Sequence, residues 1–263
     1  MASTSDKVDL EKWCDPKYAH DEMPALPAIR WNSKKTTLPA MYLLDEYAQC
    51  VGFSDDSSTW KRGEFTFEPN ESTLTVETKP CYFSSEPILA IIKTHSYRTI
   101  FRRDFGEHKK GSAVPHGMPY DNNIHSIRPT YVVAVLDRQI QAASPQSSYR
   151  LLHRDPLFWS PQSSAGAIFK KRIYDPYCRL VKEQRQDMPT YIFAIHLSST
   201  LEKVGTPSVV VNVPKGIVPT TKEELYSFFV GDEVATVLKM WYDKFSIGKD
   251  GNVKEPEIQD KPF

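Results

Sequence analysis

Short apolar runs rich in β-branched residues recur along this sequence and constrain its fold more than any other feature. Each run has the length and the valine, isoleucine and aromatic content of a buried strand. These runs occupy residues 86–97, 131–137, 190–197 and 207–214. Two segments with alternating apolar and polar residues, 64–68 and 72–83, add further strand signals earlier in the chain. The chain is therefore expected to build its core around a sheet.

One long helical pattern interrupts the strands. Residues 164–184 place Phe169, Ile173, Tyr177 and Leu180 on one face of a helix, and Pro176 within the pattern predicts a kink. A shorter amphipathic helix is predicted in the segment 38–53, where apolar residues recur at helical spacing at Met41, Leu44, Ala48 and Val51.

The segment 220–245 predicts a pair of helices near the end of the chain. Thr221 with Glu224 three residues later forms a capping box for the first helix. Gly231 is placed to end that helix, and Asp232 to cap the next. The core stripe of the second helix is formed by Val234, Val237, Leu238, Trp241 and Phe245.

These patterns predict an α+β fold with an antiparallel sheet, a mid-chain helix and a C-terminal helix pair. An OB-like barrel is one form that such a sheet can take. Strands do not alternate regularly with helices, which disfavours a doubly wound fold. We expect a polar N-terminal arm at 1–30, a single domain at 31–247 and a disordered acidic tail at 248–263.

Composition excludes several classes of protein. The 263 residues contain no run of 18 apolar residues, and the first residues lack the apolar core of a signal peptide. The four cysteines lie far apart and form no C-x-x-C pair. This pattern argues against a zinc site or a disulfide framework and fits a reducing compartment. We therefore expect a cytoplasmic protein without a metal or another cofactor.

The net charge of zero hides an uneven distribution. Residues 1–87 and 218–263 carry net charges of −6 and −3, whereas 88–130 and 150–185 carry +4 and +5. A basic middle between acidic ends can attract a polyanion even though the whole chain is neutral.

The first basic segment mixes cations with aromatic residues. Cations can follow a phosphate backbone, and aromatic faces stack on unpaired bases, so the mixture is typical of single-stranded nucleic-acid binding. The candidate residues are Lys93, Tyr97, Arg98, Phe101, Arg102, Arg103, Lys109 and Lys110. The alternative is an ordinary strand whose aromatic residues are core and whose basic neighbours face water.

The second basic cluster lies on the mid-chain helix and could line a groove. Its members are Lys170, Lys171, Arg172, Arg179 and Lys182, of which Lys171, Arg179 and Lys182 fall near one face of the helix. The alternative is a solvated helix face. Trp159 is either a base-stacking platform or a core residue. His153 and Asp155 nearby could take part in acid–base chemistry, but the sequence offers them no second carboxylate or histidine.

The loop 105–129 contains three histidines, at positions 108, 116 and 125, whose spacing matches no compact metal motif. A long loop rich in Gly, Pro and Asn predicts a flap that could close over a nucleic-acid strand. Phosphate-binding glycine motifs and nucleophile motifs are lacking, so we expect no enzymatic activity.

The chain ends in "EIQDKPF", which resembles the C-terminal tip of bacterial and phage single-stranded DNA-binding proteins. In that family the terminal phenylalanine docks into replication or repair proteins. The resemblance implies partner docking through Asp260, Pro262 and Phe263. The segment "FFVGDEVATVLKMW" is also similar to families carried on bacterial plasmids and phages, which imply no specific activity.

The sequence thus favours a non-enzymatic protein that binds single-stranded DNA or RNA and docks replication or repair partners through its tail. The alternative is a structural or protein-interaction subunit of a phage or mobile-element assembly, whose basic surface meets an acidic protein.

Overall fold

The structure is a computed structural model that describes residues 26–32, 39–67, 76–115, 117–139, 148–161, 163–205 and 208–246. Its strands are β1 (Ala28–Trp31), β2 (Met41–Leu44), β3 (Lys61–Phe67), β4 (Glu77–Ser84), β5 (Ile88–Phe101), β6 (His125–Gln139), β7 (Ser148–Leu151), β8 (Leu157–Trp159), β9 (Ile195–Val204) and β10 (Val209–Gly216). Its helices are α1 (Asp45–Val51), α2 (Ser163–Phe169), the π-helical η3 (Lys170–Tyr174), α3 (Asp175–Gln184), the 3₁₀-helical η4 (Thr190–Ile192), α4 (Lys222–Ser227) and α5 (Asp232–Ser246).

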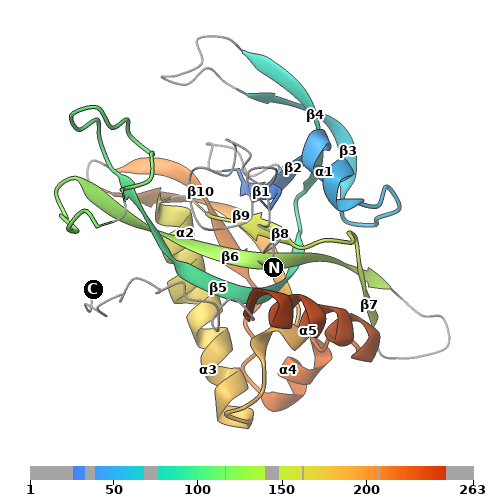
Figure 1. The fold of residues 1–263 in the computed structure, drawn as a ribbon. Coiled ribbons are helices and arrows are strands. Elements are labelled where there is room, and N and C mark those ends of the chain that lie inside the picture. The colour runs from blue at the N-terminus through green and yellow to red at the C-terminus, as the bar shows by residue number, and fades with distance from the viewer. Residues whose placement is uncertain are drawn as a thin grey trace, which may run out of the picture.

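The described strands form one strongly curled sheet, a half-barrel, in the order β10-β9-β5-β6-β8-β1-β2-β4-β3, with β7 paired to β6 (Figure 1). Neighbouring strands are antiparallel except β1 and β8, which run parallel. The α+β class and the mostly antiparallel sheet predicted from the sequence are therefore confirmed.

The central strands β5 and β6 are buried on both faces, which explains why their sequences are continuous apolar runs rather than alternating ones. One set of side chains, including Leu89 and Val133, packs under α2, η3 and α3. The alternate set, including Ile88 and Val132, packs under α5. The helices accordingly cover opposite faces of this part of the sheet (Figure 1).

The prediction of a helix across residues 38–53 is wrong in its first half. Met41–Leu44 is a strand, and the helix begins only at Asp45. Strand β2 pairs with β1 on one side and with β4 on the other, and all four of its residues are buried. Hydrogen bonding to two neighbouring strands outweighs the local helical spacing of the apolar residues.

The predicted helix at 164–184 is confirmed, with an irregularity before Pro176. Residues Lys170–Tyr174 form a π-helical turn, and the Asp175 N–H donates to Lys170 O, five residues back. A proline in a regular helix removes one backbone hydrogen bond and crowds the preceding turn. The wider π turn accommodates Pro176, which then stands in the first turn of α3.

The C-terminal helix pair is also confirmed. Thr221 Oγ1 accepts a hydrogen bond from the Glu224 N–H at 3.2 Å, which is one half of the predicted capping box. The Glu224 carboxylate accepts the N–H of Thr220, at 2.7 Å, instead of that of Thr221. Helix α4 ends at Ser227, and Gly231 adopts a φ of 89° just before α5 begins at Asp232. This left-handed conformation favours glycine. On α5, Val234, Leu238 and Trp241 are buried.

Strand β1 begins at Ala28, within the segment 1–30 that the sequence predicts as a polar arm. The predicted tail at 248–263 lies outside the described residues. In the described part of the chain, no helix is long and apolar enough to cross a membrane.

Candidate nucleic-acid interface

Strands β5 and β6 extend beyond the body of the protein. Residues 101–115 and 117–125, from the last residue of β5 to the first residue of β6, form a projection that we call the tip (Figure 1). The tip folds back on the ends of the two strands. The Phe101 N–H donates to Ser112 O at 3.1 Å, Gly111 N–H donates to Phe101 O at 2.8 Å, and Arg102 N–H donates to Ile124 O at 2.7 Å. The segment predicted as a flap is thus hydrogen-bonded to the strands that carry it.

A tight turn forms the outer part of the tip. Phe105 and His108 exchange two backbone hydrogen bonds, each 2.9 Å long, around Gly106, whose φ is 55°. The carboxylate of Asp104 supports this turn from one side by accepting the Lys110 N–H at 2.9 Å.

Phe101 is fully buried and forms the core of the tip. The His108 ring stacks on it with centroids 4.6 Å apart and planes inclined by 7°. The Phe105 ring also stacks on it, at 6.2 Å and 13°. The His125 ring meets it edge-on at 5.1 Å. The sequence-based role of Phe101 in base stacking is therefore wrong in this structure, because protein groups already cover its ring.

The aromatic surface of the tip comes from two other residues. Phe105 is 45% exposed and Tyr120 is 51% exposed. Tyr120 contacts the buried His125, whose Nδ1 accepts the Asp121 N–H at 3.0 Å. The candidates predicted from the sequence include neither Phe105 nor Tyr120, because nothing local distinguishes an exposed aromatic residue from a core one.

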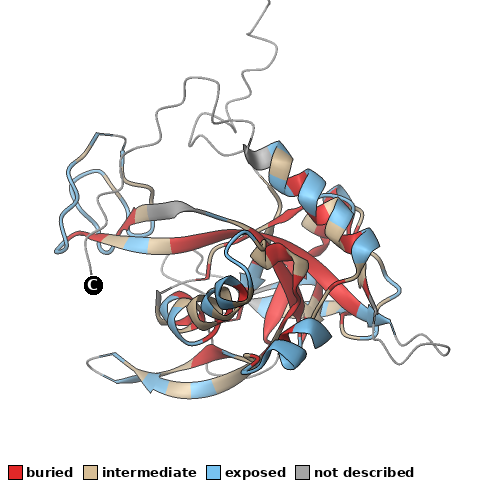
Figure 2. Ribbon diagram, turned by 90° about the horizontal axis from the view of Figure 1, so that it is seen from below, coloured by how far each residue is buried: buried red, intermediate tan, exposed pale blue. Residues whose placement is uncertain are grey.

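Four predicted cations, Arg102, Arg103, Lys109 and Lys110, are exposed on the tip. None of them forms an ion pair with another residue in the described part of the chain. The Arg102 guanidinium donates to Asn122 O at 2.9 Å, so this side chain also helps to hold the tip together. Burial decreases from the body of the sheet toward the tip, which is largely exposed (Figure 2).

Three further candidates of the first cluster lie on β5. Lys93 is partly buried where the sheet register shifts between Ile91 and Lys93. Arg98 stands opposite Arg128 in the β5–β6 register. The side chains of Tyr97 and Arg98 lie outside the described residues, so their predicted contacts with nucleic acid stay predictions.

The second predicted cluster is neutralised only in part by the protein itself. Lys170 pairs with Asp175 at 2.9 Å, and Arg172 pairs with Glu202 at 2.7 Å. The other three members, Lys171, Arg179 and Lys182, are exposed on the helix surface. These pairs leave less positive charge for a ligand than the sequence suggests.

Trp159 is fully buried, with the Phe169 ring 4.6 Å away and the Tyr131 ring 5.6 Å away. It belongs to the core beneath α2, so its proposed role as a stacking platform is wrong. The docking residues Asp260, Pro262 and Phe263 lie outside the described residues.

His153 has a structural role. Its Nε2 accepts the Val135 N–H at 2.7 Å, and its Nδ1 lies 2.6 Å from Asp155 O, to which it donates in the neutral tautomer. The ring stacks between Phe53 and Trp241. Burial lowers the pKa of His153 to about 4. In the described part of the chain, no cluster of His, Cys, Asp or Glu side chains could hold a metal ion.

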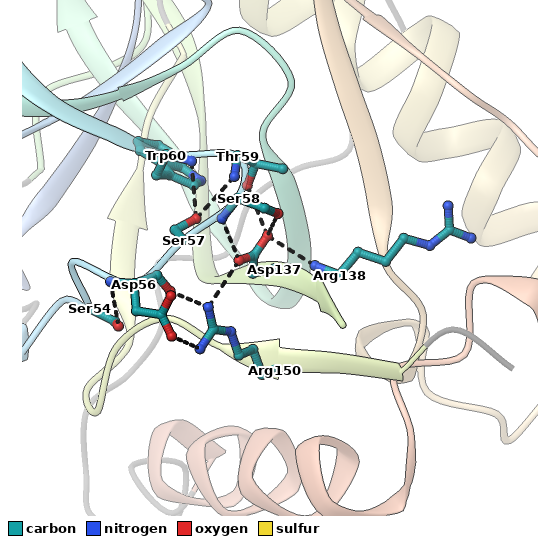
Figure 3. Close-up of polar contacts among 9 residues, drawn as sticks. All are labelled: Ser54, Asp56, Ser57, Ser58, Thr59, Trp60, Asp137, Arg138 and Arg150. Carbon is teal, nitrogen blue, oxygen red and sulfur yellow. Dashed lines mark hydrogen bonds and ion pairs between the residues drawn. The ribbon is translucent and has the colours of Figure 1, made fainter. Parts of the chain in front are cut away.

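A polar cluster that sequence reasoning missed connects the loop 54–60 to β6 and β7 (Figure 3). The buried Asp137 accepts hydrogen bonds from Ser58 N–H at 2.9 Å, from Ser58 Oγ at 2.7 Å and from Arg150 Nη2 at 3.3 Å. Arg150 also bonds Asp56. The only local signal is the Ser/Asp-rich composition of the loop.

This cluster is better suited to holding the loop than to catalysis. Burial raises the pKa of Asp137, but the hydrogen bonds from Ser58 and Arg150 outweigh it and hold the pKa below its ordinary value. A carboxylate stabilised in this way accepts a proton poorly and cannot serve as a base for Ser58.

Comparison with known proteins identifies no matching protein family, no matching curated protein and no matching solved structure.

Proposed function

We propose that this protein binds single-stranded nucleic acid through its tip. One observation carries the proposal: exposed cations that form no ion pair within the described residues lie on a folded projection that also exposes two aromatic rings, Phe105 and Tyr120. Sequence-tolerant binding of single strands combines the same two elements, cations along the phosphates and aromatic faces for the bases.

The proposal specifies a single strand because the bases of a duplex are stacked on one another and their faces cannot stack on protein rings. Phosphate contacts alone do not distinguish single strands from duplexes. Three acidic groups, Asp104, Glu107 and Asp121, also lie on the tip and reduce its net charge from +4 to +1. Aromatic contact should therefore contribute a large share of the preference. The proposal needs only the curled sheet as a support, and an OB-like barrel stays a prediction.

A protein-interaction subunit is the second candidate. The β9–β10 hairpin exposes Leu201 and Val209, which are 42% and 47% accessible. Apolar residues in such positions can meet a protein partner, and the tip cations could meet an acidic one. Failure to bind any oligonucleotide would favour this candidate.

The test measures the affinity for a fluorescent single-stranded oligonucleotide, and for its duplex form, between about 50 and 200 mM salt. Four cations contacting phosphates predict a slope of log affinity against log salt of about −3, at about −0.7 per phosphate. The single strand should bind more tightly than the duplex.

The variant Arg103→Ala/Lys109→Ala/Lys110→Ala removes three cations and spares Arg102, which holds Asn122. Its slope should flatten to about −0.7. The matched control Lys171→Ala/Arg179→Ala/Lys182→Ala removes three exposed cations from the helical region and should keep the wild-type slope. Absence of binding at the lowest salt, or equal slopes in both triple variants, would contradict the proposal.

A further inference from the structure

We propose that the rings of Phe105 and His108 together form a stacking subsite for one unpaired nucleobase. This inference rests on the proposed function and specifies how the tip distinguishes a base from bare sugar–phosphate.

The turn places the two rings on one face. Phe105 and His108 form a directly opposed antiparallel pair with two hydrogen bonds, and side chains at such positions project to the same side of a ribbon. Both rings are nearly parallel to that of Phe101, at 13° and 7°, and are therefore nearly parallel to each other. They form a platform with Phe101 beneath it.

The platform is fixed before a ligand arrives. Phe101 is fully buried, its backbone is bonded to Ser112 and Gly111, and the edge of His125 supports its ring. Phe101 covers part of the Phe105 ring, and 45% of this residue remains open to water. A base that lands there meets rings that are already oriented, so little side-chain entropy is lost on binding.

Phosphate contacts are available beside the platform. Lys109 and Lys110 follow His108 directly, and both side chains are exposed. The Asp104 carboxylate accepts the backbone N–H of Lys110, so the ammonium group of Lys110 remains available to other partners. The ligand is therefore one nucleotide unit of a single strand, with its base on the rings and a neighbouring phosphate at the lysines. A contact made through ring faces tolerates any base.

The test compares two oligonucleotides of equal length and charge, one with normal nucleotides and one with abasic sites at all internal positions. Stacking of one base predicts that wild-type protein binds the normal strand roughly 5- to 150-fold more tightly than the abasic strand. Phe105→Leu keeps an apolar side chain on the turn but lacks an aromatic face. It should reduce the difference between the two strands by weakening binding of the normal strand, whereas binding of the abasic strand should be unchanged. Phe105→Tyr should restore the difference.

Tyr226→Ala is the matched control, because Tyr226 on α4 is also 45% exposed but lies away from the tip. It should behave as wild type. An unchanged preference for the normal strand in Phe105→Leu would overturn the stacking subsite while leaving the proposed function intact. Equal binding of both strands by wild-type protein would overturn the subsite together with the base contacts of the proposed function, and would leave only phosphate binding. Failure to bind either strand would instead reject the proposed function.

Discussion

Acidification from about pH 6.5 to 4 should destabilise this protein, in a range where the titration of carboxylates changes its stability little. His153 is buried between the Phe53 and Trp241 rings and connects the backbone of β6 to α5. Its Nε2 accepts a backbone N–H and therefore cannot carry a proton without losing that bond. Burial holds the pKa of His153 at about 4 in the folded protein, against 6.5 for a free side chain.

His196 on β9 is a second histidine whose surroundings lower its pKa. Its Nε2 lies 2.8 Å from the Tyr149 hydroxyl, and the Phe228 ring lies 5.1 Å from its own. Burial and the nearby positive charge of Arg138 lower the pKa of His196 to about 4. Both histidines are thus neutral in the folded state above this pH.

The sign of the effect follows from these pKa values. Between about pH 4 and 6.5 the unfolded chain binds more protons than the folded protein, so stability falls as the pH falls through this range and is fully present above 6.5. At pH 5 the loss is about 2 kcal/mol for His153, and at most about 2 kcal/mol for His196, whose ring is partly exposed. Asp137, whose pKa is lowered in the folded protein, stabilises it at neutral pH. That stabilisation is lost mainly below about pH 4, outside this range.

Urea unfolding at about pH 8 and pH 5 measures this loss as a shift of the midpoint at constant slope. The expected total is about 2–4 kcal/mol. His153→Gln cannot titrate at this position and should reduce the difference between the two pH values by about 2 kcal/mol, even though the variant is less stable at both. Wild-type stability that is the same at both pH values, or a pH dependence that is unchanged in His153→Gln, would show that the buried neutral histidines do not cause the loss.

Three further predictions concern stability. Asp137→Ala leaves Arg150 and Ser58 without their shared acceptor and should cost about 3–5 kcal/mol of unfolding free energy, measured by urea denaturation. Phe101→Ala removes the core of the tip and should cost about 3–5 kcal/mol, with new protease cleavage between residues 101 and 125; resistance of that segment would place Phe101 outside the core. Thr221→Ala should lower stability by about 1 kcal/mol, detectable as a reduced melting temperature, because the Glu224 N–H loses its acceptor.

Elements with strong local patterns could be predicted from the sequence. The apolar runs of β5 and β6 match strands buried on both faces, and the Thr221–Glu224 pair marks the start of α4. The segment 38–53 was predicted as one helix because strand β2 and helix α1 follow each other without a break. Apolar residues inside β2 and then inside α1 happen to repeat at helical spacing.

The site was less predictable, because exposure depends on contacts between residues that local patterns do not connect. Phe101 and Phe105 are equivalent in the sequence, and only the fold of the tip buries one and exposes the other. Arg172 looks free until β9 brings Glu202 beside it. The bonds of Asp137 to Ser58 and Arg150 likewise depend on the curl of the sheet.

The most direct test of the central claim locates a bound single strand on the protein. A photoreactive single-stranded oligonucleotide is crosslinked to the full chain, and the attached residues are identified by mass spectrometry. Binding through the tip predicts crosslinks within residues 101–125, at Phe105, His108 or Tyr120, that disappear when unlabelled single strand is added in excess. Crosslinks that map instead to residues 170–184 or to the β9–β10 hairpin, with none in the tip, would contradict it.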